Sequence, residues 1–177
     1  LEHHNLTIEE LINNPENYAQ AQAVLERQLQ IATGCDDQRG ICEAQETIGM
    51  VYWSQGEWER AAASCLQAIA IAASLAYKQI LTRASLTLGN VRSSQRRFSE
   101  AVRRYVDAGS QARQIDDRQA ISWATSNIAM VLARRGDSAR ALAGYERSLR
   151  IAWEIGDRWT ACLNVAGLAS VYERLGQ

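Results

Sequence analysis

The chain has 177 residues, of which 47% are hydrophobic and 22% are charged, and its formal net charge is −1. Such a composition is typical of a folded protein and offers no excess of positive charge for binding nucleic acid. No apolar run approaches the roughly 18 residues of a membrane span and no basic-then-apolar leader opens the sequence, so we expect a cytoplasmic protein with neither a membrane nor a nucleic-acid partner.

The start of the chain carries two helix signals. We interpret residues 1–6 as a vector-derived tag or a disordered lead. Thr7-Ile8-Glu9-Glu10 has the spacing of a capping box, which predicts a short helix over 8–13. Asn14-Pro15 then supplies a cap and a proline at the first helical position, so a longer helix is expected over 15–33.

A repeat of 40 residues, kept in register without a gap, dominates the rest of the chain. Its clearest copies are Thr47-Ile48-Gly49-Met50-Val51-Tyr52, Thr87-Leu88-Gly89-Asn90-Val91-Arg92, Asn127-Ile128-Ala129-Met130-Val131-Leu132 and Gly167-Leu168-Ala169-Ser170-Val171-Tyr172. A fixed period of about 20–50 residues indicates a stack of identical units. Apolar residues recur every three or four positions within each half-unit, so each unit is predicted to be two helices. The predicted helices span 38–54, 58–75, 78–94, 98–114, 118–134, 138–154 and 158–175.

Glycine, aspartate and alanine recur with the period. Gly56 and Gly136 lie between the two helices of a unit, where a left-handed residue is expected, and Arg96 takes that place in the second unit, so its turn must differ or carry strain. Aspartates at the unit junctions are positioned to cap the next helix: Asp37, Asp117 and Asp157. Small residues predict close contact between a column on the first helices and a column on the second: Gly49, Gly89, Ala129 and Ala169, facing Ala61, Ala101 and Ala141.

These columns resemble the tetratricopeptide repeat. The matching features in the first full unit are Ile48-Gly49 with Tyr52, the turn glycine Gly56, Trp58, Ala61 and Ala68. The usual repeat has about 34 residues. The longer unit here, with its ending Ile151-Ala152-Trp153-Glu154-Ile155-Gly156-Asp157, is similar to the 40-residue repeats of spindle-orientation adaptors, rapsyn and the sensor domains of bacterial signal-transduction ATPases and activators.

The resemblance implies an all-α fold, a right-handed α-solenoid of antiparallel helix pairs that forms a TPR-like superhelix. We predict a single solenoid domain over 7–177. Its units are a partial unit at 7–37, full units at 38–77, 78–117 and 118–157, and a partial unit at 158–177. The last predicted helix has no second helix after it, so we expect either a longer native protein or self-association through the C-terminal helix.

Residues that could carry chemistry are scarce. The only histidines are His3 and His4, so a serine or cysteine nucleophile has no histidine base in the folded part, and no glycine-rich phosphate loop is present. We therefore expect no enzyme activity. Of the four cysteines, Cys35 and Cys65 fall in repeat columns predicted to be buried, which favours free thiols over metal ligands. Neither a metal nor a cofactor is expected.

Arginines concentrate in the middle of the chain. They are Arg92, Arg96, Arg97, Arg103, Arg104 and Arg113. A basic cluster is one mark of nucleic-acid binding. The interpretation we favour is a solvated helix face whose arginines form ion pairs with Glu100 and Asp107.

One face of each first helix varies between units, while the buried columns do not. In a stack of helix pairs the first helices line the concave wall, so this face is the predicted recognition surface. Aromatic residues, methionine and arginine, which it carries, are favoured in interface cores. The predicted protein-binding residues are Glu46, Met50, Trp53, Arg83, Asn90, Trp123, Asn127, Met130 and Arg134. The alternative is that Trp53, Leu86 and Trp123 pack against the first helix of the neighbouring unit.

Two functions are compatible with such a surface. The first is a protein–protein interaction scaffold that binds a peptide or helix of a partner protein in its concave groove. The second is an effector-sensing or regulatory segment of a larger bacterial signalling ATPase or transcription regulator. In either case the expected partner is another protein or another domain of the same full-length protein.

Overall fold

The computed structural model describes residues 17–176, and within that range every regular element is a helix. The helices are α2 (Tyr18–Gly34), α3 (Gln38–Ser54), α4 (Trp58–Ser74), α5 (Lys78–Ser94), α6 (Phe98–Gln114), α7 (Arg118–Arg134), α8 (Ser138–Ile155) and α9 (Arg158–Leu175). The predicted lead at 1–6, the short helix at 8–13 and the first residues of the 15–33 helix lie outside the described residues.

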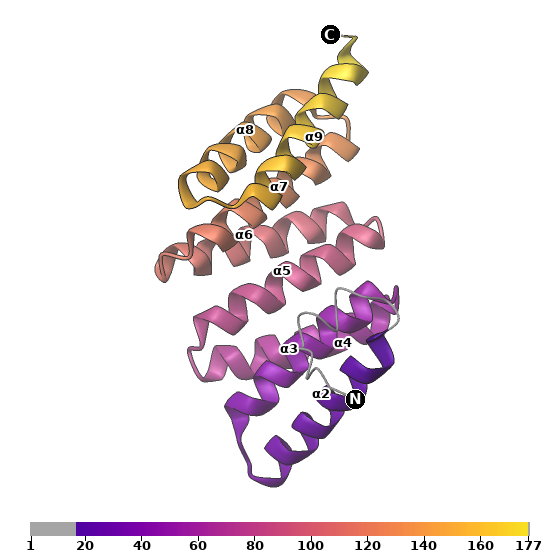
Figure 1. Cartoon of the computed structure of the whole chain (residues 1–177), viewed down its shortest axis with the longest axis vertical. Helices are drawn as coiled ribbons and strands as arrows, with labels where there is room; N and C mark the ends of the chain where they lie inside the picture. Colours follow the sequence, from indigo (N-terminus) through magenta and orange to yellow (C-terminus); the bar gives the residue numbers. More distant parts are fainter. Residues whose placement is uncertain (1–16, 177) are drawn as a thin grey trace, which may run out of the picture.

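The helices form one elongated stack that runs from α2 at one end to α9 at the other (Figure 1). Each helix packs on the next in the chain, and the first helices of the units also contact one another, α3 with α5, α5 with α7 and α7 with α9. The second helices make no comparable contact among the described residues. The wall made of first helices is therefore the tighter, inner side of the stack. The prediction of an all-α solenoid of helix pairs is confirmed.

The turns between helices use left-handed backbone at a fixed place in the repeat. Gly56 and Gly136 have φ angles of 77° and 84°, as predicted. Arg96 has a φ of 59°, so its turn keeps the same shape, and the strain lies in the backbone of a residue that carries a Cβ. The sequence did not reveal that the junctions between units repeat this conformation, at Asp36, Ala76, Asp116 and Gly156.

Aspartate side chains cap the first helices, as predicted. The carboxylates of Asp37, Asp117 and Asp157 accept hydrogen bonds from the backbone N–H groups of Gly40, Ala120 and Thr160. Asp137 caps the second helix α8 in the same way by accepting from the N–H of Arg140 at 3.2 Å, which the sequence reading missed. These caps fix where α3, α7, α8 and α9 begin, whereas α5, which begins after Tyr77, has no side-chain cap.

The small columns lie at helix contacts. Ala61, Ala101 and Ala141 are fully buried. A Cβ at Gly49 would lie 2.6 Å from the Cys65 Sγ and 3.3 Å from the Ala61 carbonyl oxygen. At Gly89 the nearest atoms belong to the Tyr105 ring, at 2.4 Å. At both glycines the closest neighbour is therefore the residue four positions after the alanine, Cys65 or Tyr105. Ala169, in the same column, is exposed because no second helix follows α9 in the described residues.

Two further expectations can be compared with the structure. Cys65 is buried, and burial raises the pKa of its thiol to about 12, but the prediction that Cys35 is buried is wrong. Cys35 directly follows the last residue of α2, so its side chain lies beyond the contact between helices.

The expected ion pairs are present: Arg97 lies 2.7 Å and Arg92 3.6 Å from the Glu100 carboxylate, and Arg104 lies 3.9 Å from that of Asp107.

Candidate functional site

A groove of about 780 Å³ runs along the inner wall and is lined by residues of α3, α5, α7 and α9. Seven of the nine residues selected from the sequence line it: Glu46, Met50, Trp53, Arg83, Asn90, Trp123 and Asn127. Met130 and Arg134 are not among the lining residues. Met130 packs beside the buried cluster of Ala129 and Tyr145, and Arg134 is exposed near the end of α7.

The C-terminal part of the groove exposes large apolar side chains. Trp123 is 39%, Leu163 is 50% and Trp159 is 74% exposed. Trp159 was missed from the sequence because it lies in a column that is polar elsewhere, with Gln79 and Gln119 at the equivalent positions. The available signal was an aromatic residue at a position where the repeat does not require one.

The indoles link neighbouring units and still face the groove. Trp53 donates its Nε1–H to the Ser94 Oγ at 3.3 Å, and Trp123 donates to the Thr160 Oγ1 at 2.9 Å, in both cases on the next first helix. Leu86 is only 6% exposed. Packing against the neighbouring unit, the alternative considered from the sequence, therefore describes Leu86 fully. For Trp53 and Trp123, this packing accounts for the polar edge of the indole, and the apolar ring also lines the groove.

An ion pair joins α3 to α5 on the groove wall. The Arg83 Nη2 lies 2.8 Å from the Glu46 Oε2, and the Glu46 side chain is only 2% exposed. Burial raises the pKa of the Glu46 carboxyl, and the positive charge of Arg83 offsets part of that rise. The Arg83 side chain is 51% exposed, so its remaining N–H groups face solvent beside the groove.

Asn90 and Asn127 are joined across α5 and α7. The Asn127 Nδ2 donates to the Asn90 Oδ1 at 3.3 Å, and the Tyr105 hydroxyl donates to the same oxygen at 2.8 Å. These bonds hold both amides in place on the groove wall. The Asn90 Nδ2 and the Asn127 Oδ1 form no hydrogen bond with another described residue, which leaves the N–H groups of one amide and the oxygen of the other for a ligand.

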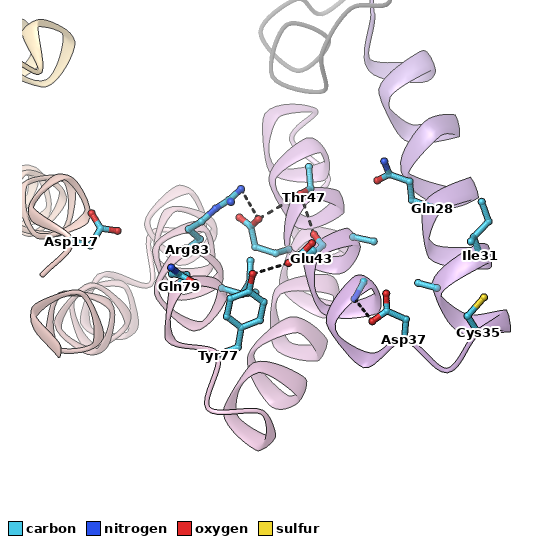
Figure 2. Close-up of a pocket in the computed structure, with 15 residues that line it drawn as sticks. Gln28, Ile31, Cys35, Asp37, Glu43, Thr47, Tyr77, Gln79, Arg83 and Asp117 are labelled. Carbon is cyan, nitrogen blue, oxygen red and sulfur yellow. Dashed lines mark hydrogen bonds and ion pairs between the residues drawn. The ribbon is translucent and has the colours of Figure 1, made fainter. Parts of the chain in front are cut away.

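A larger cavity, of about 900 Å³, adjoins the groove and shares Glu46 and Arg83 with it. Figure 2 shows its polar wall, where the Tyr77 hydroxyl donates to Glu43 at 2.7 Å and Asp37 caps α3. Its polar groups are thus largely bonded to one another. We take the smaller groove as the candidate site because it exposes the large apolar side chains of Trp123, Trp159 and Leu163.

Other classes of site find no support in the described residues. No group of three or more histidine, cysteine, aspartate or glutamate side chains among them is placed to hold a metal ion. None of the helices between residues 17 and 176 is long and apolar enough to cross a membrane.

Comparison with known proteins agrees with the repeat. A family model described as "Tetratricopeptide repeat" matches residues 48–76, the end of α3 together with α4. The crystal structure of BtubC (BKLC) from P. vanneervenii superposes with a TM-score of 0.79 at 18% sequence identity, covering 96% of this chain and 72% of that one. No curated protein matches the chain.

The matched repeat supports the tetratricopeptide-repeat family for this chain, which shares the helical-repeat fold of the solved structure. Its fold is that of a helical-repeat scaffold for protein interactions in general. The 40-residue subclass stays a prediction.

Proposed function

We propose that the chain is an interaction module that holds a segment of a partner protein in the groove along α3, α5, α7 and α9. The observation that supports this most strongly is the gathering of seven sequence-selected residues on one groove whose C-terminal part exposes Trp123, Trp159 and Leu163. Clustered apolar side chains rimmed by polar groups mark interaction sites on soluble proteins. Tryptophan in particular is enriched among the residues that dominate binding energy.

The groove offers three kinds of contact to an extended or helical segment. The rings of Trp123 and Trp159 provide an apolar surface for large side chains. The free donor of Asn90 and the free acceptor of Asn127 match the carbonyl and N–H groups of a peptide backbone. Arg83 keeps Glu46 as its partner and presents its other N–H groups to a carboxylate of the bound segment.

Trp123→Ala should weaken binding by roughly 2 kcal/mol, because a tryptophan at the centre of an interface is a typical hot spot. The measurement is fluorescence anisotropy of labelled peptides that have first been selected from a display library on the wild-type chain. Trp153→Ala is the matched control: Trp153 is 65% exposed on α8 and does not line the groove. Equal losses in the two variants, or none in Trp123→Ala, would reject the groove as the binding site.

A further inference from the structure

A second crevice opens on the opposite side of the stack, between the second helices α6 and α8. It has a volume of about 420 Å³, its floor is α7, and its walls include Val106 and Gly109 of α6 and Gly144 of α8. None of its lining residues lines the concave groove. A ligand here would therefore be held independently of one in the groove.

Two glycines, where the preceding unit has bulky side chains, account for the crevice. Gly109 falls in the column of Ile69, and Gly144 falls in the column of Arg104. Ile69 packs against the buried clusters around α4, and the Arg104 side chain is only 26% exposed. The α6–α8 interval has neither side chain, so the space that they fill one unit earlier is left open.

The floor of the crevice is correspondingly uncovered. Ser85 and Leu88 of α5 are 3% and 0% exposed, but their equivalents in α7, Thr125 and Ile128, are partly exposed. Leu132 adds to this apolar floor. Apolar side chains at the bottom of a crevice between two helices can accept a large side chain from outside.

The rim carries positive charge at positions that are neutral or acidic one unit earlier. Arg113, Arg140 and Arg147 stand where the preceding unit has Ala73, Glu100 and Asp107. Arg140 is paired with Asp137, whereas Arg113 and Arg147 form no ion pair with a described residue. The nearby acidic groups are Asp116, in an adjoining hollow, and Glu154, which is paired with Arg118.

We propose that this convex crevice is a second docking site, for an acidic segment of a partner protein that inserts a large apolar side chain between Gly109 and Gly144. Carboxylates beside that side chain would lie next to Arg113 and Arg147. A protein segment fits better than a small molecule because the crevice is open along the surface, whereas small-molecule sites bury about 70–90% of their ligand. The segment's backbone stays outside while its side chain fills the opening.

The test uses labelled helical peptides of 12 residues with one central leucine or phenylalanine flanked by glutamates. Matched peptides carry alanine at the centre, or lysines in place of the glutamates. Anisotropy titrations should show binding that weakens as salt rises, with the alanine and lysine peptides about tenfold weaker or more. A peptide selected for the concave groove should not compete.

Gly109→Leu places a large apolar side chain at the position that Ile69 occupies one unit earlier, so it should fill the crevice and abolish this binding. A Cβ at Gly109 meets only ordinary contacts, the closest being 3.5 Å from the Ala124 Cβ, so the variant should fold and its melting temperature should be unchanged or higher. Gly34→Leu, whose Cβ would meet nothing within 4 Å, is the control. The surface double variant Arg113→Glu/Arg147→Glu should also weaken binding by about tenfold or more, compared with Arg27→Glu/Arg158→Glu.

Three results would overturn the proposal. The first is Gly109→Leu and Arg113→Glu/Arg147→Glu variants that both bind the peptides as the wild type does. The second is the failure of every peptide in the panel to bind. The third is the anionic dye 1-anilino-8-naphthalenesulfonate binding in a manner lost in Gly109→Leu while no peptide binds, which would assign the crevice to a small amphiphile.

Discussion

Arg96 is the residue at which the repeat departs most clearly from its own pattern. A left-handed conformation costs an L-residue about 1–2 kcal/mol, and Gly56 and Gly136 avoid that cost at the equivalent turns. Arg96→Gly should therefore raise the free energy of unfolding by about 0.5–1 kcal/mol, after allowing for the extra freedom of glycine in the unfolded chain. Urea denaturation measures this.

Arg103→Gly provides the control of opposite sign. Arg103 is exposed in the interior of α6, where glycine costs about 1 kcal/mol relative to a good helix former. If Arg96→Gly destabilises the chain as much as Arg103→Gly does, the backbone at residue 96 carries no strain.

Single residues also show where sequence reasoning reaches its limit. Gly56 and Asp117 could be assigned because glycine and aspartate have strong, local roles at turns and caps. Ala76 adopts left-handed backbone, with a φ of 50°, although alanine has no preference for that conformation. Trp159 belongs to the groove, but its neighbours in the repeat are polar, so no column identified it.

At the scale of elements, the Glu46–Arg83 pair connects α3 to α5 and makes their contact sensitive to pH. Burial raises the pKa of Glu46 above its ordinary value of 4.5, so the folded state holds this proton more tightly than the unfolded state does. The contribution of Glu46 to stability is therefore full below pH 4.5 and is lost as the pH rises through the folded-state pKa.

Glu46→Gln removes this titration, so its stability relative to the wild type should improve as the pH rises from 4 to 7. Arg83→Gln should have the opposite effect, because Glu46 then loses the cation that offsets its burial. Its cost at pH 7 should stay below the roughly 3–5 kcal/mol of breaking a fully buried pair, since Arg83 is half exposed. Chemical denaturation at several pH values measures both, and parallel pH profiles for the two variants would contradict the account.

The helices themselves were predictable because each helix boundary recurs at the same position in several repeats. The expected spans 38–54, 78–94 and 118–134 are those of α3, α5 and α7. Which of their side chains are buried and which are exposed was harder to predict. Leu86 and Trp123 lie on the same predicted face and both line the groove, yet Leu86 is 6% and Trp123 is 39% exposed. That difference depends on the spacing between units, which no local pattern encodes.

At the scale of the whole molecule, α9 presents a face that α4, α6 and α8 cover on the other first helices. Val165 is 51% and Tyr172 is 38% exposed, whereas Tyr52, in the column of Tyr172, is 7% exposed. Burying such a face is worth about 25 cal/mol for each Å² of apolar area. We therefore expect this 177-residue chain to associate through α9 as its concentration rises.

Sedimentation velocity over a concentration series measures this association. The variant Val165→Glu/Tyr172→Glu should remain monomeric throughout, because both side chains are exposed and the charges oppose burial. A wild-type chain that sediments as one monomeric species at every concentration would contradict the expectation.

The inner wall of the stack is the surface proposed to bind a partner segment. The most direct measurement is the map of backbone amide chemical-shift changes when a display-selected peptide is titrated into the ¹⁵N-labelled chain. We predict that the largest changes fall around Trp53, Asn90, Trp123 and Trp159, on α3, α5, α7 and α9. Changes confined to the second helices α4, α6 and α8 would contradict binding at the inner wall.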